Sequence, residues 1–69
     1  MPFYEALKYI LNTANGKVRR KSWENYYYLK REYANSRYFI VLMIHNTFMP
    51  YSPSSEELVS EDWEIVYDI

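Results

Sequence analysis

The sequence predicts an α+β domain: an N-terminal helix packed on a small, mainly antiparallel sheet, with a short second helix before the last strand. Three observations carry this prediction: one segment with helical periodicity, several short alternating or apolar segments, and turn residues between them. The 69 residues are expected to form a single domain, 1–69. A chain of this size buries only ~60% of its unfolded surface, so its own core is small.

A helix is predicted over about residues 3–14. Pro2 stands where a first-turn proline is tolerated. The one glycine, Gly16, follows the last periodic residue and is predicted to be a left-handed C-cap. One continuous apolar face is formed by residues at helical spacing, namely Phe3, Ala6, Leu7, Ile10, Leu11 and Ala14.

Two strands are predicted in the next part of the chain. The segment "KVRR" is short and offers one residue for burial, Val18, so it is predicted to be an edge strand. In "YYYLKREY", Tyr26 and Tyr28 fall on the opposite face from the residue between them, and the β-favouring composition is typical of a strand.

A hairpin is predicted around the most apolar run of the chain, "YFIVLMI". "NSR" indicates a turn before it, and "HN" a two-residue turn after it that leads into "TFMPY", where Pro50 indicates an edge or a bulge. Both faces of the run are apolar, which is typical of a strand covered twice. One helix covers one face, so a partner subunit is expected to cover the other.

The C-terminal segment is predicted to contain the short second helix and the last strand. Ser54 followed three residues later by Glu57 is a capping box, which predicts one or two helical turns. Trp63, Ile65 and Tyr67 then alternate with other residues, as expected of a strand.

Composition narrows the possible functions. The absence of cysteine excludes disulfides and thiolate metal sites and fits a reducing cytoplasm, where the protein is expected to act. A net charge of −1 gives no general attraction for duplex nucleic acid or anionic membrane. The N-terminus has neither a basic leader nor a long apolar run, so no signal peptide or membrane span is predicted. Fourteen aromatic residues (nine Tyr, three Phe, two Trp) suit interfaces and pockets.

Neither catalysis, a metal site nor a cofactor is predicted. His45 is the one histidine, and its place in a predicted turn indicates an exposed residue rather than a ligand. A single glycine cannot build a phosphate-binding loop. The carboxylates after Ser54 are interpreted as helix-start and solvated residues. The protein is therefore expected not to be an enzyme.

The segment "KVRRKSWENYYYLKRE" combines basic and aromatic residues. Trp23, Tyr26 and Tyr28 are candidates either for core packing or for stacking on a base, which is worth ~1–3 kcal/mol per base. Arg20 lies close to them in sequence and could hold a phosphate through charge-assisted hydrogen bonds. Spacing alone leaves both interpretations open.

Three motifs occur in a specific order: "FYEAL" opening the first helix, "GKVRRKSW", and "MPYSPSSEELVSEDWEIV" with its Leu-x-x-x-Asp-Trp of Leu58, Asp62 and Trp63. This pattern resembles the second Thoeris anti-defence family of small phage proteins over nearly the whole chain. The resemblance implies a homo-oligomer, dimer or tetramer, that sequesters cyclic nucleotide signals. The implied ligand is chiefly glycocyclic ADP-ribose made by a bacterial TIR-domain enzyme, bound without degradation in the host cytoplasm.

The resemblance also implies roles for particular residues. Arg20 and Trp23, together with Tyr51 and Ser54, would line the pocket, whereas Asp62 and Trp63 are expected to be structural. The middle segment is shorter than in many family members, and Tyr51 stands where tryptophan is common. With the two tyrosines of the basic segment, the expected ligand-binding set is Arg20, Trp23, Tyr26, Tyr28, Tyr51 and Ser54.

An alternative function comes from the many tyrosines. A small protein inhibitor could dock on a host enzyme through exposed aromatic side chains, since tyrosine is favoured at such surfaces. A co-purifying host protein would favour this alternative, and a heat-stable small molecule recovered from the purified protein would favour the sponge.

Overall fold

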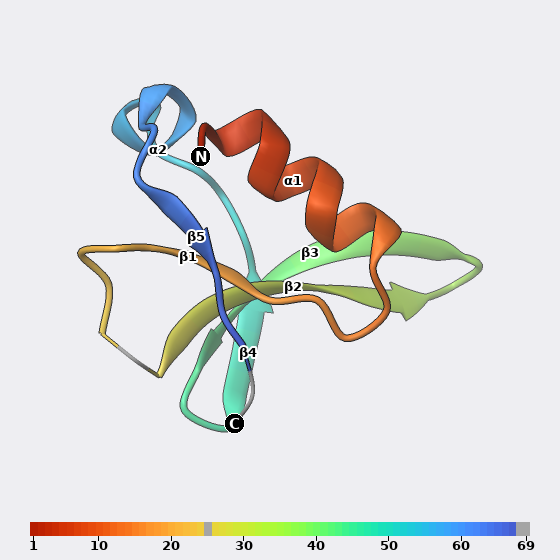
Figure 1. The fold of residues 1–69 in the computed structure, drawn as a ribbon. Coiled ribbons are helices and arrows are strands. Elements are labelled where there is room, and N and C mark those ends of the chain that lie inside the picture. Colours follow the sequence, from red (N-terminus) through yellow and green to blue (C-terminus); the bar gives the residue numbers. More distant parts are fainter. Residues whose placement is uncertain (25, 68–69) are drawn as a thin grey trace.

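Two helices and five strands make up the part of the chain that the computed structural model describes, residues 1–24 and 26–67. Figure 1 shows them in the order predicted from the sequence, with the short second helix before the last strand. The α+β class is confirmed. The elements are α1 (Phe3–Asn12), β1 (Val18–Arg20), β2 (Tyr27–Ala34), β3 (Arg37–Ile44), β4 (Thr47–Pro50), α2 (Ser55–Val59) and β5 (Trp63–Ile65).

The strands form one antiparallel sheet in the order β4-β3-β2-β1-β5. The prediction that the "KVRR" segment is an edge strand is wrong, because β5 returns to pair with β1, with Val18 opposite Ile65. This pairing joins segments far apart in the chain, so no local pattern indicates it. Pro50 does lie in an edge strand, β4, where its missing N–H leaves no ladder bond unmade.

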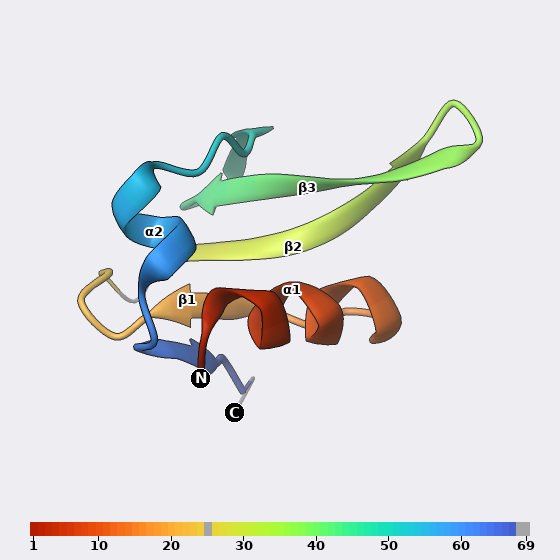
Figure 2. The same ribbon diagram turned by 90° about the horizontal axis from the view of Figure 1, so that it is seen from above.

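The β2–β3 hairpin is paired along its full length, from Tyr27↔Ile44 to Ala34↔Arg37. Its turn residues, Asn35 and Ser36, both have positive φ (53° and 64°), which matches the right-handed twist of a two-residue hairpin. The outer half of the hairpin runs past β1 and projects from the body (Figure 2). We call residues 31–40 the hairpin arm.

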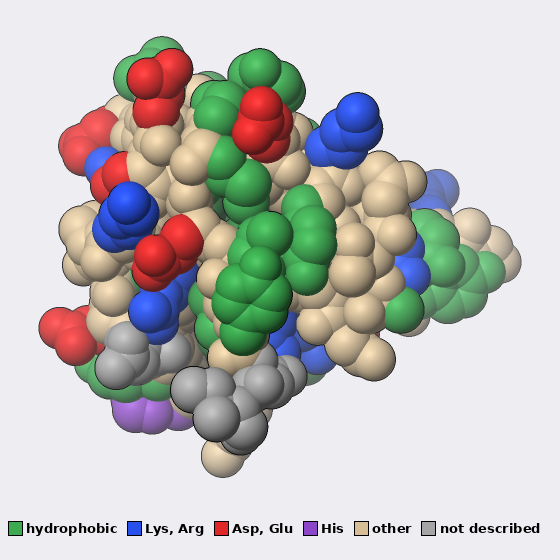
Figure 3. Space-filling view, in the orientation of Figure 1, with side chains coloured by type: hydrophobic (Ala, Val, Ile, Leu, Met, Phe, Trp, Pro, Cys, Tyr) green, Lys and Arg blue, Asp and Glu red, His purple; other side chains and the backbone are tan. Residues whose placement is uncertain are grey.

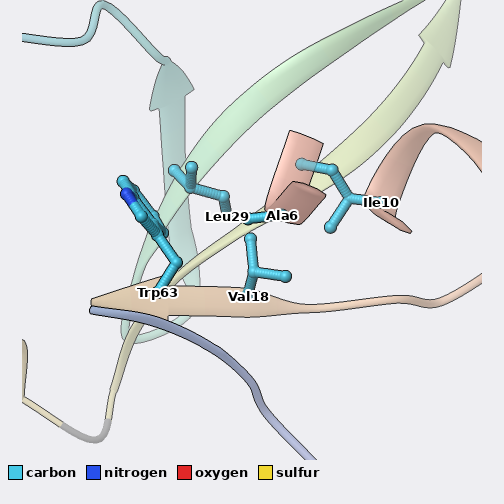
Figure 4. Close-up of a cluster of buried hydrophobic side chains, with 5 residues drawn as sticks. All are labelled: Ala6, Ile10, Val18, Leu29 and Trp63. Atoms are coloured by element: carbon cyan, nitrogen blue, oxygen red, sulfur yellow. The ribbon is translucent and has the colours of Figure 1, made fainter. Parts of the chain in front are cut away.

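Helix α1 packs its apolar face on the sheet and encloses the core (Figure 4). Ala6 and Ile10 from the helix meet Val18 of β1, Leu29 of β2 and Trp63 of β5, and each is at most 1% exposed. Full burial of a large apolar side chain contributes ~1.5–3 kcal/mol. A cluster this small is consistent with the limited core expected for the chain length.

The sheet face away from α1 is partly closed by the protomer itself. Val41 and Met43 are buried, and the register places Pro50 beside Val41 and Phe48 beside Met43. The protomer alone therefore buries these two residues, and the cover by a partner subunit expected from the sequence is not required for them. The exposed part of β3 is its first three residues, 37–39, which follow the turn at the tip of the arm.

Helix α1 ends at Asn12, two residues before the predicted boundary. The predicted left-handed C-cap at Gly16 is also wrong, because Asn15 adopts that conformation (φ 62°) and Gly16 has no positive φ. Asparagine tolerates this region better than most residues. Gly16 is required for another reason: a Cβ there would lie 3.0 Å from a ring carbon of Tyr9 and 3.1 Å from the Thr13 carbonyl oxygen.

Replacing Gly16 with alanine should lower the free energy of unfolding by ~1–3 kcal/mol, the usual cost of overpacking. The Thr13 carbonyl belongs to the backbone and cannot rotate away as a side chain could. Urea unfolding measures the effect. Asn15→Gly is the matched control, and it should leave stability equal or higher because glycine accepts positive φ. An unchanged midpoint for Gly16→Ala would contradict the crowding explanation.

Candidate functional site

Four of the six expected ligand-binding residues come together at the α2 end of the molecule. Arg20 ends β1, Trp23 lies in the turn that follows it, Tyr51 follows β4, and Ser54 is the N-cap of α2. Trp63, which is 1% exposed, lies at the centre of this end: Arg20 is its partner in the β1–β5 ladder, Trp23 contacts its ring, and Tyr51 packs against the buried cluster that contains it. The return of β5 to β1 brings these separate parts of the chain to one place.

Aromatic rings form the apolar part of this cluster. Trp23 lies edge-on to Trp63, with ring centroids 5.2 Å apart and planes at 75°. Phe3 contacts Trp63 at 5.2 Å and Tyr51 at 6.4 Å between centroids. The Trp63 indole N–H donates to the Glu57 carbonyl oxygen at 3.2 Å, so this buried ring has its polar group satisfied.

The side chain of Glu57 links Tyr51 to Ser54. Its Oε1 accepts from the Tyr51 hydroxyl and from the Ser54 backbone N–H, both at 3.0 Å. The Ser54 hydroxyl accepts from the Glu57 N–H at 3.2 Å, which confirms the predicted capping box. Burial, then the hydrogen bond to Glu57, raises the pKa of Tyr51 well above its usual value. The phenol therefore remains a donor at neutral pH.

Arg20 is held by two carboxylates. Its Nε and Nη2 donate to the two carboxylate oxygens of Asp62 at 2.9 and 3.3 Å, and Nη1 donates to Glu56 at 3.1 Å. The hydrogen bonds to Asp62, followed by those to Glu56, raise the pKa of Arg20. Three of the five guanidinium N–H groups are used, which leaves two for a ligand. One cation faces two anions here, so a phosphate would approach a site of net negative charge.

Tyr26 and Tyr28 lie away from the other four residues. Tyr26 precedes β2 and stacks on His45 in the β3–β4 turn, with centroids 4.0 Å apart and planes at 12°. Tyr28 lies on the sheet face opposite Leu29, with the Lys17 ammonium 4.9 Å from its ring centroid. His45 is exposed in this turn, as the sequence predicted.

Sequence reasoning missed part of the cluster. The capping box indicated the helix-start role of Glu57, but no local signal indicates its bond to Tyr51, because the loop between β4 and α2 sets that contact. Phe3 was assigned only to the apolar face of α1. Likewise, Glu56 and Asp62 were interpreted as solvated or structural residues, whereas both bind Arg20.

An apolar groove of about 500 Å³ lies beside the cluster, between α1 and β3. It is lined by apolar and aromatic side chains, and none of its lining residues is charged. The residues are Phe3, Leu7 and Leu11 from α1, Tyr38, Phe39 and Ile40 from β3, and Pro50, Tyr51 and Pro53 at one end.

Two further findings concern the residues that the structure describes. Among them, no three histidine, cysteine or carboxylate side chains are grouped so that they could hold a metal ion. No helix in the described part is long and apolar enough to cross a membrane.

The Arg20–Asp62 pair should make the free energy of unfolding depend on pH in the acid range. Hydrogen bonding from Arg20, the largest cause, lowers the pKa of Asp62 below its usual 3.8. In acid the unfolded chain takes up this proton first, so the stabilisation is present at neutral pH and is lost as the pH falls below ~4. Melting curves should show the stability difference between wild type and Asp62→Asn closing on acidification. A difference that stays constant from pH 7 to 3 would contradict this role.

The fold and the site together define a class of protein, a small α+β domain with one antiparallel sheet. At one end of this sheet, the short second helix and the last strand hold a cluster of aromatic and carboxylate side chains. The family model described as the Thoeris anti-defense 2-like domain matches residues 1–66 of the chain. The chain therefore belongs to this family, which confirms the resemblance inferred from the sequence motifs and indicates a role in Thoeris anti-defence. No curated protein matches the chain.

Proposed function

We propose that this protein is an anti-defence sponge that binds a cyclic nucleotide immune signal of the glycocyclic ADP-ribose type and holds it without degrading it. The observation that carries the proposal is membership of the Thoeris anti-defense 2-like family over residues 1–66. The proposed form is a single-domain homo-oligomer that acts in the cytoplasm of the host of a phage. Capture of this kind requires only binding, so no catalytic group or cofactor is needed.

The proposed pocket lies at the α2 end of the molecule. Trp23 supplies a ring held at a fixed angle by its edge-on contact with Trp63, and a ring held this way loses little freedom on stacking a base. Arg20 supplies two remaining N–H groups for a phosphate oxygen. The Tyr51 hydroxyl stays protonated and can exchange its bond to Glu57 for one to the ligand.

The two carboxylates bound to Arg20 affect how a phosphate can bind there. They lower the affinity for phosphate, and they also hold the guanidinium in one orientation. Binding a phosphate at Arg20 therefore requires partial displacement of Asp62 or Glu56. Of the two, Glu56 is the more easily displaced, since its side chain is 77% exposed against 36% for Asp62.

Isothermal titration calorimetry of the purified protein against a panel of cyclic nucleotides tests the proposal. The expected result is saturable binding of glycocyclic ADP-ribose, with linear mononucleotides binding much more weakly. If no cyclic nucleotide binds and a host protein co-purifies instead, the inhibitor function is correct. Its exposed aromatic side chains would then be the docking surface.

A further inference from the structure

The described part of the chain exposes more large hydrophobic side chains than it buries. Eleven are exposed and seven hydrophobic residues are buried. Figure 3 shows one group of hydrophobic side chains on the projecting arm and further groups near the middle and upper part of the same face. Scattered apolar residues are normal on a protein surface, but a continuous apolar surface indicates an interaction site.

The groove between α1 and β3 is unsuited to a nucleotide. A phosphate needs cations or N–H donors, and none of the nine side chains that line the groove is charged. The groove runs along α1 from Leu11, near the arm, to Phe3, near α2. Its apolar and aromatic lining suits the aromatic side chains of a protein partner.

The hairpin arm has the properties that this groove requires. Tyr33 and Tyr38 face each other across the two strands, with centroids 5.0 Å apart, and are 60% and 55% exposed. The arm is fully hydrogen-bonded within itself and ends in a tight turn, so it is already ordered before any contact. Tyr38 also lines the groove, so arm and groove form one continuous surface, as a twofold contact between identical chains requires.

Charges at the two ends of this surface are complementary. Glu32 of the arm is paired with Lys30 at 2.7 Å, whereas Arg37 at the tip has no carboxylate partner among the described residues. The other end of the groove adjoins α2, where segment 54–64 carries five carboxylates and no cation. Three of these carboxylates pair with Arg19 and Arg20, so the five together with these two arginines keep a net negative charge. An arm lying antiparallel to its counterpart places Arg37 beside these carboxylates, which favours this orientation.

We infer that two copies of this chain associate through a twofold axis, with the hairpin arm of each seated in the groove of the other. This inference rests on the homo-oligomer proposed above and names its surface. A standard interface buries ~800 Å² per partner, about one sixth of the 4972 Å² surface of this protomer. Because the contact occurs twice, the arm and the groove of each chain need to contribute only ~400 Å² each.

Light scattering on paired variants tests the surface, without nucleotide present. Leu11→Glu places a charge in the groove, and Tyr4→Glu places the same charge on an exposed residue of the same helix that does not line the groove. We expect wild type and Tyr4→Glu to have at least twice the 8.5 kDa protomer mass. Leu11→Glu should be a folded monomer at the same concentration, with folding checked by circular dichroism.

Cysteine cross-linking tests the arrangement independently, because the chain has no cysteine of its own. Arg37 begins β3 at the tip of the arm, and Pro53 comes just before the N-cap of α2. Because the β2–β3 turn and α2 lie at opposite ends of the molecule (Figure 2), a disulfide between these positions forms only between two chains. The Arg37→Cys, Pro53→Cys double variant should give a covalent dimer on mild oxidation, and neither single variant should.

Each result decides the inference. A wild-type mass of 8.5 kDa, a Leu11→Glu oligomer as large as wild type, or the absence of the disulfide dimer would overturn it. If Leu11→Glu does not fold, the cross-linking result alone decides. Failure of nucleotide binding in calorimetry with a positive cross-link would reject the proposed ligand and leave the interface standing.

Discussion

Replacing Trp63 with alanine should lower the free energy of unfolding by ~3–5 kcal/mol, the range for removing a buried tryptophan. A domain of this size has roughly that much stability in total, so much of the variant should be unfolded at room temperature. Trp63 is 1% exposed and contacts Phe3 and Trp23, and its indole donates to Glu57. Its backbone also binds Met1, whose amino group donates to the Trp63 carbonyl oxygen at 2.7 Å.

Chemical unfolding followed by circular dichroism measures this loss. Trp63→Phe should cost less, because a ring remains in the cluster and only the indole hydrogen bond and part of the volume are lost. Tyr67→Ala is the matched control, because Tyr67 is an aromatic residue of the same segment but is exposed. This substitution should change the free energy of unfolding by less than ~0.5 kcal/mol. A Trp63→Ala variant as stable as this control would show that the core is not where the structure places it.

The second large effect concerns the ligand. Trp23→Ala should weaken binding of the cyclic nucleotide by ~1–3 kcal/mol, roughly a five- to 150-fold loss of affinity, if this ring stacks on a base. Trp23 also packs against the core, so calorimetry must be done on protein shown to be folded. Trp23→Phe keeps a ring and should retain part of the affinity. Equal binding by wild type and folded Trp23→Ala would place the pocket elsewhere.

Two variants separate the binding and structural roles of Arg20. Arg20→Ala should weaken binding, more strongly at low salt because a charge interaction at a partly exposed site is screened by added ions. Glu56→Gln keeps the guanidinium and its two bonds to Asp62 but removes the competing carboxylate that is more easily displaced. If Arg20 holds phosphate, Glu56→Gln should bind the ligand more tightly than wild type. If Arg20 only supports the fold, both substitutions should weaken binding alike.

Local sequence signals predicted most of the fold. The apolar period from Phe3 predicts α1, the Ser54 capping box predicts α2, and the apolar run predicts β3. These features succeed because each is set by residues within one turn or one strand. The helix end was less accurate: α1 stops at Asn12 with Thr13 as an extended C-cap, and the left-handed residue of the following turn is Asn15 rather than Gly16.

Contacts between distant residues could not be predicted in this way. Pairing of β5 with β1 makes β1 an interior strand, and it also brings Asp62 to Arg20, 42 residues earlier in the chain. The same return places Trp63 against Trp23. The family motifs singled out Arg20, Trp23, Tyr51 and Ser54, which do lie together, whereas strand alternation alone suggested Tyr26 and Tyr28, which lie elsewhere.

Capture without degradation can be measured directly. Glycocyclic ADP-ribose is mixed with an equal amount of protein sites and passed through a filter that retains protein. The retained fraction is then heated, and the released nucleotide is identified by mass spectrometry. The account predicts that the nucleotide is retained with the protein and released chemically intact after heating. Nucleotide that passes freely through the filter, or that emerges as a cleaved product, would contradict it.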